Sequence, residues 1–369
     1  QAPSKSPDVG VKSPKSKEKK KVVTKRTKKP VEVVPTVEDN DVDAAPSMLI
    51  QIPENLMNRK SVMGVVNKST GTSLSAPVTV IAPVTDKKAL TAHNKKFIDT
   101  ILSKNAQTLR QEFLKDHKEA PKEMNTANRF VISTNVPPDS DYYDANYFEF
   151  PGVEPKFIVA SAPTADATSR ETFWRMVYDS NVTNIFNVET FEETKQEQAF
   201  MPWKANDGKD YGKMFIANKK ATIGKRDAQA VLEVLPDGCS NSIIVRIAQT
   251  KGWYESVTPE SEIRRIVLYY LRLMKDEKGT CMIICRNGWD RSCMFVVMHC
   301  VVSLLNGKKD VIIPDILYKL RESRFGAIQT FQQYLALHEG ISDYIRIKTP
   351  TLEEETEKIK QLMFDCNKP

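Results

Sequence analysis

The chain has 369 residues, with 54 lysines and arginines against 47 aspartates and glutamates and a net charge of +7. This length allows one large domain or two ordinary ones. Eleven of the basic residues and only two of the acidic ones lie in residues 1–31, so the rest of the chain is mildly acidic. The charge is therefore no evidence for a nucleic-acid-binding fold, and no apolar run has the length of a membrane span.

The first 88 residues are predicted to be a disordered tail and linker. Residues 1–31 are rich in Lys, Ser and Pro and have almost no large apolar side chains, so burial cannot offset the entropy cost of ordering them. Residues 32–47 are acidic, and residues 48–85 mix prolines with small residues. The basic run 17–29 is interpreted as a solvated segment that contacts acidic surfaces, with anionic lipid, nucleic acid or an import receptor as its candidates.

Ordered elements are predicted from residue 89 onward. Apolar residues recur at helical spacing until shortly before Pro121, which indicates a helical region. A further helix is expected at 170–179. Strands are expected at 157–160, 184–188, 214–217, 230–235 and 242–248, the last three in antiparallel hairpins.

The second half of the chain alternates helices with one apolar strand. The strand is expected at 281–284, and helices are expected at 261–275, 293–305, 310–324, 330–344 and 351–363. These elements predict an α/β fold of the α+β type, a mixed twisted sheet flanked by helices. We assign the domain to residues 89–348 and a charged C-terminal helix to residues 349–369.

The six cysteines do not form a disulfide-scaffold or metal-binding pattern. No CxxC pair and no Cys/His metal spacing occurs, so we expect no metal and no cofactor. A reducing compartment is indicated, and the cytoplasm is the expected location, with the nucleus as the alternative.

The stretch from Cys285 to Arg291 has the pattern of a phosphate site. It lies between an apolar strand and an apolar helix, and this geometry aims backbone N–H groups and a helix N-terminus at one point, where an anion is favoured. A thiol at that point is in a positive field that favours the nucleophilic thiolate. The arginine fork binds phosphate oxygens in a bidentate manner. Taken alone, the spacing favours a buried structural cysteine beside a surface arginine, so the rest of the chain has to decide.

Several other motifs surround this stretch in a fixed order. They are Asn128-Arg129-Phe130, Tyr143-Asp144-Ala145-Asn146-Tyr147, Phe173-Trp174, Glu192-Glu193, Trp253, Pro259, Arg324 and Gln329-Thr330-Phe331-Gln332-Gln333. The ordered set resembles the protein tyrosine phosphatase domain over about residues 90–346.

The resemblance implies a role for each matching residue. Cys285 falls where the family has the nucleophile that forms a cysteinyl-phosphate, and Arg291 falls where the family binds the phosphoryl oxygens. Ser292 matches the hydroxyl that assists the thiolate as a leaving group. Gln329 and Gln333 match the glutamines that orient the hydrolytic water.

The same resemblance assigns the substrate contacts. The loop residues Arg286, Asn287, Gly288 and Trp289 would surround the phosphoryl group. Outside the loop, Phe130 would take the place of the ring that stacks on phosphotyrosine. Trp253 would belong to the movable loop that delivers the general acid.

The chain departs from the family pattern at several of these places. The histidine before the cysteine is Ile284, and the general acid of the movable loop, an aspartate in the family, is Glu255. The acidic residue that clamps the peptide backbone is replaced by Ile132. A longer acid is easily misplaced, and a misplaced catalytic group can cost about 100-fold in rate.

Asp290 is a further departure, because a carboxylate beside a phosphate repels it. The segment Gly288-Trp289-Asp290-Arg291 is, however, similar to the loop of myotubularin-type phosphoinositide phosphatases. By that resemblance, Asp290 would replace Glu255 as the proton donor.

Three functions therefore remain open from the sequence. The first is hydrolysis of phosphotyrosine in a protein or peptide. The second is a pseudophosphatase that binds phosphoproteins or a kinase as a signalling scaffold. The third is phosphoinositide hydrolysis helped by the basic tail.

Overall fold

The computed structural model describes residues 87–117, 128–134, 141–189, 200–250, 252–253, 260–274 and 280–368. All of them belong to one compact unit, Pro46–Pro369. The predicted tail and linker, residues 1–88, lies almost entirely outside these described residues.

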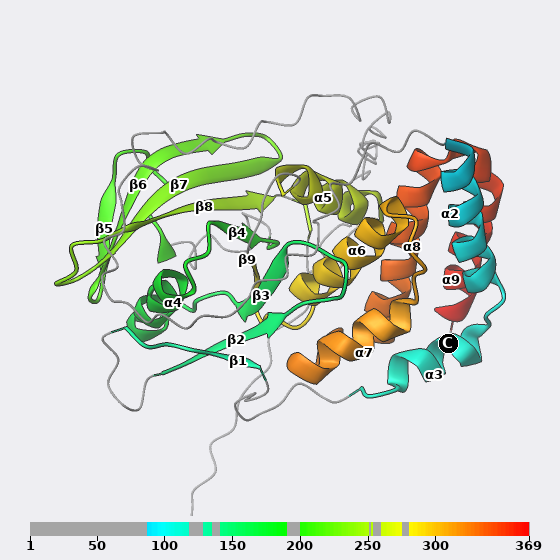
Figure 1. Cartoon of the computed structure of the whole chain (residues 1–369), viewed down its shortest axis with the longest axis horizontal. Coiled ribbons are helices and arrows are strands. Elements are labelled where there is room, and N and C mark those ends of the chain that lie inside the picture. Colours follow the sequence, from blue (N-terminus) through cyan, green and yellow to red (C-terminus); the bar gives the residue numbers. More distant parts are fainter. Residues whose placement is uncertain are drawn as a thin grey trace, which may run out of the picture. The chain divides into compact units, whose positions relative to one another are not determined.

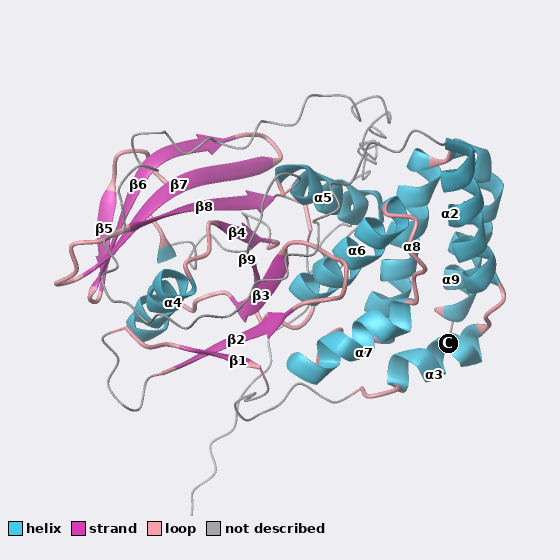
Figure 2. Cartoon of the chain, viewed as in Figure 1, coloured by secondary structure: helices cyan, strands magenta, loops and turns pink. Residues whose placement is uncertain are grey.

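A twisted mixed sheet forms the centre of this unit (Figure 2). Its strands are β1 (Arg129–Val131), β2 (Tyr142–Phe148), β3 (Lys156–Ser161), β4 (Asn184–Asn187), β5 (Gly208–Tyr211), β6 (Met214–Ile223), β7 (Asp227–Pro236), β8 (Ile243–Thr250) and β9 (Thr280–Cys285). Within the described residues they pair in the order β1-β2-β3-β9-β4-β8-β7-β6-β5. The four central strands β3, β9, β4 and β8 are parallel, and the outer pairs are antiparallel.

Helices cover both faces of the sheet (Figure 1). They are α2 (Lys87–Leu102), α3 (Ala106–Leu114), α4 (Ala167–Ser180), α5 (Glu260–Leu273), α6 (Arg291–Asn306), α7 (Ile313–Ser323), α8 (Phe331–Lys348) and α9 (Glu353–Cys366). Helix α4 packs on one face, and the larger helical layer built around α6 packs on the other. The predicted fold class, a mixed sheet flanked by helices, is confirmed.

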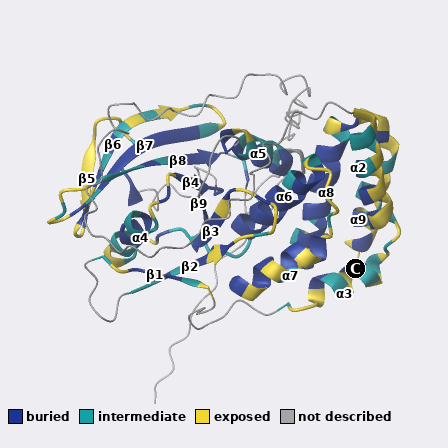
Figure 3. Cartoon of the chain, viewed as in Figure 1, coloured by how far each residue is buried: buried dark blue, intermediate teal, exposed yellow. Residues whose placement is uncertain are grey.

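The central strands are buried on both faces, and their side chains alternate between two cores (Figure 3). In β9, Ile283 and Cys285 belong to the core on the α6 side, whereas Met282 and Ile284 belong to the core on the α4 side. Successive side chains of a strand point to opposite faces, so this division follows from the backbone. It places the thiol of Cys285 on the face that α6 covers.

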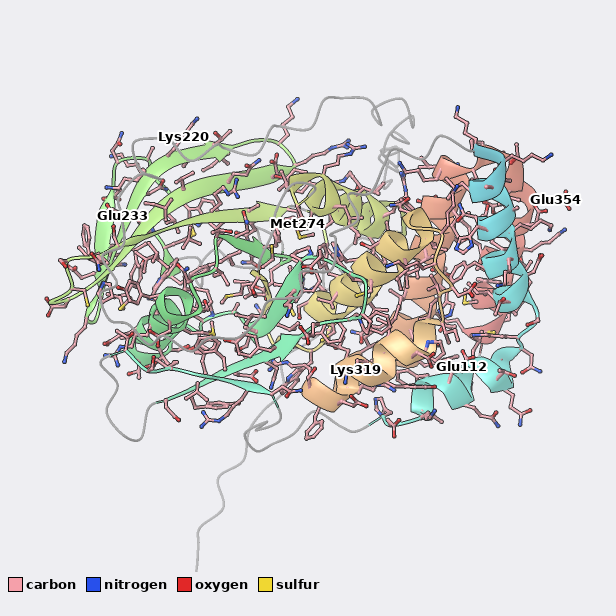
Figure 4. The ribbon with its side chains drawn as sticks, viewed as in Figure 1. Glu112, Lys220, Glu233, Met274, Lys319 and Glu354 are labelled. Atoms are coloured by element: carbon pink, nitrogen blue, oxygen red, sulfur yellow. The ribbon has the colours of Figure 1, made fainter. Side chains whose placement is uncertain are left out.

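The helical layer is held together by apolar packing with a few polar links between its members. Helix α6 is buried along almost its whole length. Helix α9 packs against α8 and α2 and contributes Ile359 and Met363 to the same core. Glu112 of α3 is labelled in Figure 4. It accepts a hydrogen bond from the Tyr334 hydroxyl of α8 at 3.1 Å and pairs with Lys104 at 2.7 Å.

The structure corrects some predicted boundaries. The helical region predicted from residue 89 is interrupted at Ser103–Asn105, because the Asn105 side chain accepts from the Thr108 N–H and begins a second helix. Strands β1, β2 and β5 were not predicted, and β6 and β7 are longer than expected. None of the helices that the structure describes has the length and apolarity needed to cross a bilayer.

Candidate active site

Cys285 is the last residue of β9, in the middle of the parallel part of the sheet. In α/β sheets the carboxyl ends of parallel strands form the edge at which ligands bind. The neighbouring strands β3 and β4 end beside it, with Ser161 opposite Cys285 and Asn187 opposite Ile284. The main chain holds the position further, since Cys285 O accepts from the Ala162 N–H at 2.8 Å and from the Gly288 N–H at 3.2 Å.

The loop from Arg286 to Asp290 connects Cys285, at the end of β9, to the start of α6. Gly288 has φ +69°, and a Cβ built on it would lie 2.7 Å from the Ala160 carbonyl carbon and the Ser161 nitrogen. Only glycine allows the loop to lie this close to β3. The Gly288 carbonyl oxygen accepts a hydrogen bond from Arg324 Nε at 3.1 Å.

Arg324 is fully buried and anchors the loop to the sheet. Its Nη1 donates to Asp144 Oδ1 at 2.6 Å and to Asn146 Oδ1 at 2.7 Å. Its Nη2 donates to Asp144 Oδ2 at 2.8 Å. A buried charge is tolerated only when it is paired and hydrogen-bonded, and Arg324 meets both conditions through β2. The loop from Arg286 to Asp290 is therefore fixed by a polar network that spans three parts of the chain.

The Cys285 thiol is buried against the first turn of α6. Its Sγ lies 3.2 Å from Ser292 Oγ and accepts from the Ser292 N–H at 3.5 Å. Burial raises the pKa of this thiol above its ordinary value, and the Ser292 hydrogen bond and the Arg291 charge act against that increase. The neighbourhood thus contains the groups that stabilise a thiolate, but the effect of burial on the pKa is larger.

Arg291 begins α6 and is 5% exposed. Its Nη1 donates to the Trp253 carbonyl oxygen at 2.7 Å, and its Nη2 lies 3.6 Å from Glu189 Oε1. Glu189 follows β4 and is 1% exposed, and Arg286 Nε lies 4.0 Å from the same oxygen. The guanidinium is thus held between a carboxylate and a main-chain carbonyl, next to the thiol.

Asn287 is joined to other groups of the loop. Its Oδ1 accepts from the Trp289 N–H at 2.9 Å and from the Asp290 N–H at 3.3 Å, and it lies 3.5 Å from Cys285 Sγ. Its Nδ2 donates to Asp290 Oδ2 in a short hydrogen bond. Asp290 occupies the N-cap position of α6 without a side-chain cap bond. The side chains of these two predicted residues therefore bond to each other, and that of Asn287 also bonds to two loop amides.

Comparison with known proteins decides the family. The family model described as protein-tyrosine phosphatase matches residues 118–343. The chain belongs to the protein-tyrosine phosphatase family. The predicted resemblance is confirmed.

Curated relatives carry the same family name. A Caenorhabditis elegans protein, named as a provisional tyrosine-protein phosphatase, is 26% identical over 188 residues, which are 51% of this chain and 46% of that protein. Human receptor-type tyrosine-protein phosphatase epsilon is 24% identical over 217 residues, which are 56% of this chain and 30% of that protein. The chain thus spans less than half the length of these two relatives.

The remaining residues predicted for this tyrosine-phosphatase site lie in two groups. Gln329 and Gln333 flank the start of α8, where Gln333 Oε1 accepts from the Gln329 N–H at 3.0 Å and from the Thr330 N–H at 3.2 Å. Phe130 and Ile132 are 3% and 2% exposed and belong to the core on the α4 side. The Phe130 ring lies 5.5 Å from the Tyr147 ring.

Part of the expected acid loop lies outside the described residues. Glu255 and Pro259 are among the undescribed residues, and so are Glu192 and Glu193 of a separate motif. Trp253 is described and is 3% exposed. Among the described residues, no cluster of three histidine, cysteine or acidic side chains has the arrangement of a metal site.

Sequence reasoning missed Glu189 as a member of the site. A signal was available, because Glu189 stands two residues beyond β4, whose carboxyl end lies at the same sheet edge as that of β9. Asp144 was listed only as part of a motif, and its pairing with Arg324 depends on a contact 180 residues apart in the chain.

Proposed function

We propose that this protein-tyrosine phosphatase domain hydrolyses phosphotyrosine in a protein or peptide through a cysteinyl-phosphate intermediate. The observation that carries the proposal is the position of Cys285 Sγ, 3.2 Å from Ser292 Oγ and beside the buried Arg291 at the start of α6. A bound phosphoryl group would meet the helix N-terminus and the guanidinium at this point. Both favour the thiolate that the chemistry needs.

In the first step, the Cys285 thiolate attacks phosphorus. The S–P bond forms as the bond from phosphorus to the tyrosine oxygen breaks, while Arg291 and the loop amides hold the phosphoryl oxygens. The departing phenolate takes a proton from a carboxylic acid, for which Glu255 and Asp290 are the candidates.

In the second step, water attacks the cysteinyl-phosphate. Gln329 and Gln333 orient the water, which gives its proton to the carboxylate that acted as the acid. The S–P bond breaks, the thiolate leaves with a hydrogen bond from the Ser292 hydroxyl, and inorganic phosphate is released.

A second candidate is a pseudophosphatase that binds a phosphoprotein or a kinase without turnover. Three observations favour it. Ile284, at the position of the family's histidine, is buried in the opposite core; Phe130 is 3% exposed; and burial raises the Cys285 pKa. Each of these reduces either thiolate formation or stacking on a phenyl ring.

An aryl phosphate assay under reducing conditions separates the two functions. Phosphate release that Cys285→Ser abolishes is expected for the hydrolase. Absence of turnover, together with phosphopeptide binding that Arg291→Met removes, would establish the binding protein instead. Reducing conditions are needed because an activated thiol oxidises readily.

The pH dependence of turnover identifies the acid. The proton donor must be protonated in the active form, so its loss should remove the alkaline decline of kcat. The profiles of Glu255→Gln and Asp290→Asn are compared with that of the unmodified protein. A profile unchanged in Glu255→Gln but flattened in Asp290→Asn would assign the proton to the loop aspartate.

A further inference from the structure

The Asn287 side chain accepts hydrogen bonds from the main chain of its own loop. Its Oδ1 accepts from the Trp289 and Asp290 N–H groups at 2.9 and 3.3 Å and lies 3.5 Å from Cys285 Sγ. Backbone N–H groups that converge in front of a helix N-terminus are the donors an oxyanion uses. In this loop, two of those donors already have an acceptor from the protein itself.

The thiol contact points in the same direction. An amide oxygen only accepts hydrogen bonds, so Asn287 Oδ1 can take the single proton of the Cys285 thiol, for which Ser292 Oγ at 3.2 Å is the other acceptor. A thiolate at that place would face the partial negative charge of the same oxygen. The contact therefore favours the neutral thiol, the unreactive form.

Asp290 holds this arrangement from the other end of the amide. Asn287 Nδ2 donates to Asp290 Oδ2. If the amide group were flipped, its oxygen would face the Asp290 carboxylate, and two acceptors cannot bond to each other. The same hydrogen bond occupies one oxygen of the Asp290 carboxyl group, which is one of the two candidate proton donors in the proposed function. One side chain thus engages the nucleophile, two anion-binding amides and a candidate acid.

We propose that Asn287 is an internal occupant of the phosphate cradle, and that rotation of its side chain gates the site. In the closed state the amide takes the place of a phosphoryl oxygen. In the open state it leaves the Trp289 and Asp290 N–H groups to the substrate, removes its oxygen from Cys285 and releases Asp290. The proposal rests on the proposed function for the identity of the ligand, an oxyanion of the phosphate type.

Tungstate binding to the Cys285→Ser protein tests the gate without needing turnover. Asn287→Ala removes the internal acceptor, so calorimetry should give a tungstate affinity at least 5-fold higher, which corresponds to about 1 kcal/mol. An affinity that is unchanged or lower would overturn the proposal. A merely structural asparagine would not give tighter binding when it is removed.

Asn105 supplies a matched control. Its Oδ1 accepts from the Thr108 N–H at 2.9 Å at the start of α3, so it makes the same type of bond away from the loop. Asn105→Ala should lower the melting temperature and leave tungstate affinity unchanged. Equal gains in affinity from both variants would show that the effect is not local to the cradle and would also overturn the gate.

A measurement on the unaltered asparagine protects the test against a folding defect in Asn287→Ala. The side-chain NH₂ resonances of Asn287, followed by NMR in the Cys285→Ser protein, should move on tungstate saturation as the bond to Asp290 breaks. Unchanged resonances at saturation would refute the rotation. Turnover is measured separately. If tungstate binding shows the gate but no phosphate is released, only the proposed function is contradicted. If phosphate is released but tungstate binding shows no gate, only this inference is contradicted.

Discussion

The groups around Cys285, the proposed nucleophile, have opposing electrostatic effects on its thiol. Ser292 and Arg291 favour the Cys285 thiolate, whereas burial and the Glu189 carboxylate raise the thiol pKa. Glu189 is 1% exposed and 3.6 Å from the Arg291 guanidinium, so solvent screens it poorly. The reactivity of the free protein therefore depends on how far this carboxylate offsets the arginine charge.

Glu189→Gln should make Cys285 more reactive. Loss of the carboxylate removes a negative charge that disfavours the thiolate, so the thiol pKa should fall and alkylation at neutral pH should become several-fold faster. Site-resolved mass spectrometry of iodoacetamide labelling across pH measures the shift. The exposed Glu149, paired with Lys156 at 2.6 Å, provides the control Glu149→Gln. A midpoint that stays in place or rises would contradict the prediction.

Gly288→Ala should destabilise the protein by about 3 kcal/mol and abolish anion binding. The methyl group would meet Arg324 and the main chain of Ala160 and Ser161, in addition to the cost of a positive φ. Gly238 has φ +73° with nothing within 4 Å of a built Cβ, so Gly238→Ala isolates the cost of φ alone, about 1 kcal/mol. Urea unfolding compares the two variants. Equal losses would show that packing of the loop on β3 is unimportant.

At the scale of elements, the periodicity of apolar residues accounts for most of what was predicted. The apolar run before Cys285 predicted β9, and the helix after it was placed within two residues of α6. The break between α2 and α3 was missed, because the periodicity continues across it while the Asn105 cap acts locally. The self-contained hydrogen bonding of Asn287 was also missed, since the motif specifies a role but no side-chain rotamer.

The start of α8 allows the capping and catalytic roles of one residue to be separated. Thr330 and Gln333 form a reciprocal capping box, so Gln333 has a structural function besides its proposed catalytic one. Gln333→Glu keeps an acceptor suited to this position and favourable to the helix dipole, so stability should stay within about 0.5 kcal/mol. If Gln333 also orients water, burst kinetics should show hydrolysis of the intermediate slowed about 10-fold.

Thr330→Ala is the converse variant at the same helix end. It removes the N-cap acceptor for the Gln333 N–H and should cost about 1 kcal/mol in urea unfolding. The rate of intermediate hydrolysis should change little, because the Gln333 side chain remains. Should Gln333→Glu lose stability while hydrolysis keeps its rate, the glutamine would be structural only.

At the scale of the whole molecule, the fold encloses two histidines that the site does not use. His299 Nε2 lies 3.0 Å from the Glu154 carbonyl oxygen, and His338 Nδ1 lies 2.8 Å from the Tyr334 carbonyl oxygen. Within the part of the chain that the structure describes, the other ring nitrogen of each has no hydrogen-bond partner. His299 is 2% exposed, and His338 is fully buried. Protonating either ring would bury a charge with an unpaired N–H.

These two rings predict how stability depends on pH. Burial lowers the pKa of His299 and of His338 from 6.5 to about 4. Between these values the unfolded chain binds more protons than the folded one, so stability is lost as pH falls from 6.5 toward 4, by up to about 3 kcal/mol per histidine. Urea unfolding at pH 7.5, 6 and 5 measures the loss. The double variant His299→Gln/His338→Gln should flatten the dependence above pH 5, where most carboxylates are still ionised, and an unchanged slope would exclude the histidines as its cause.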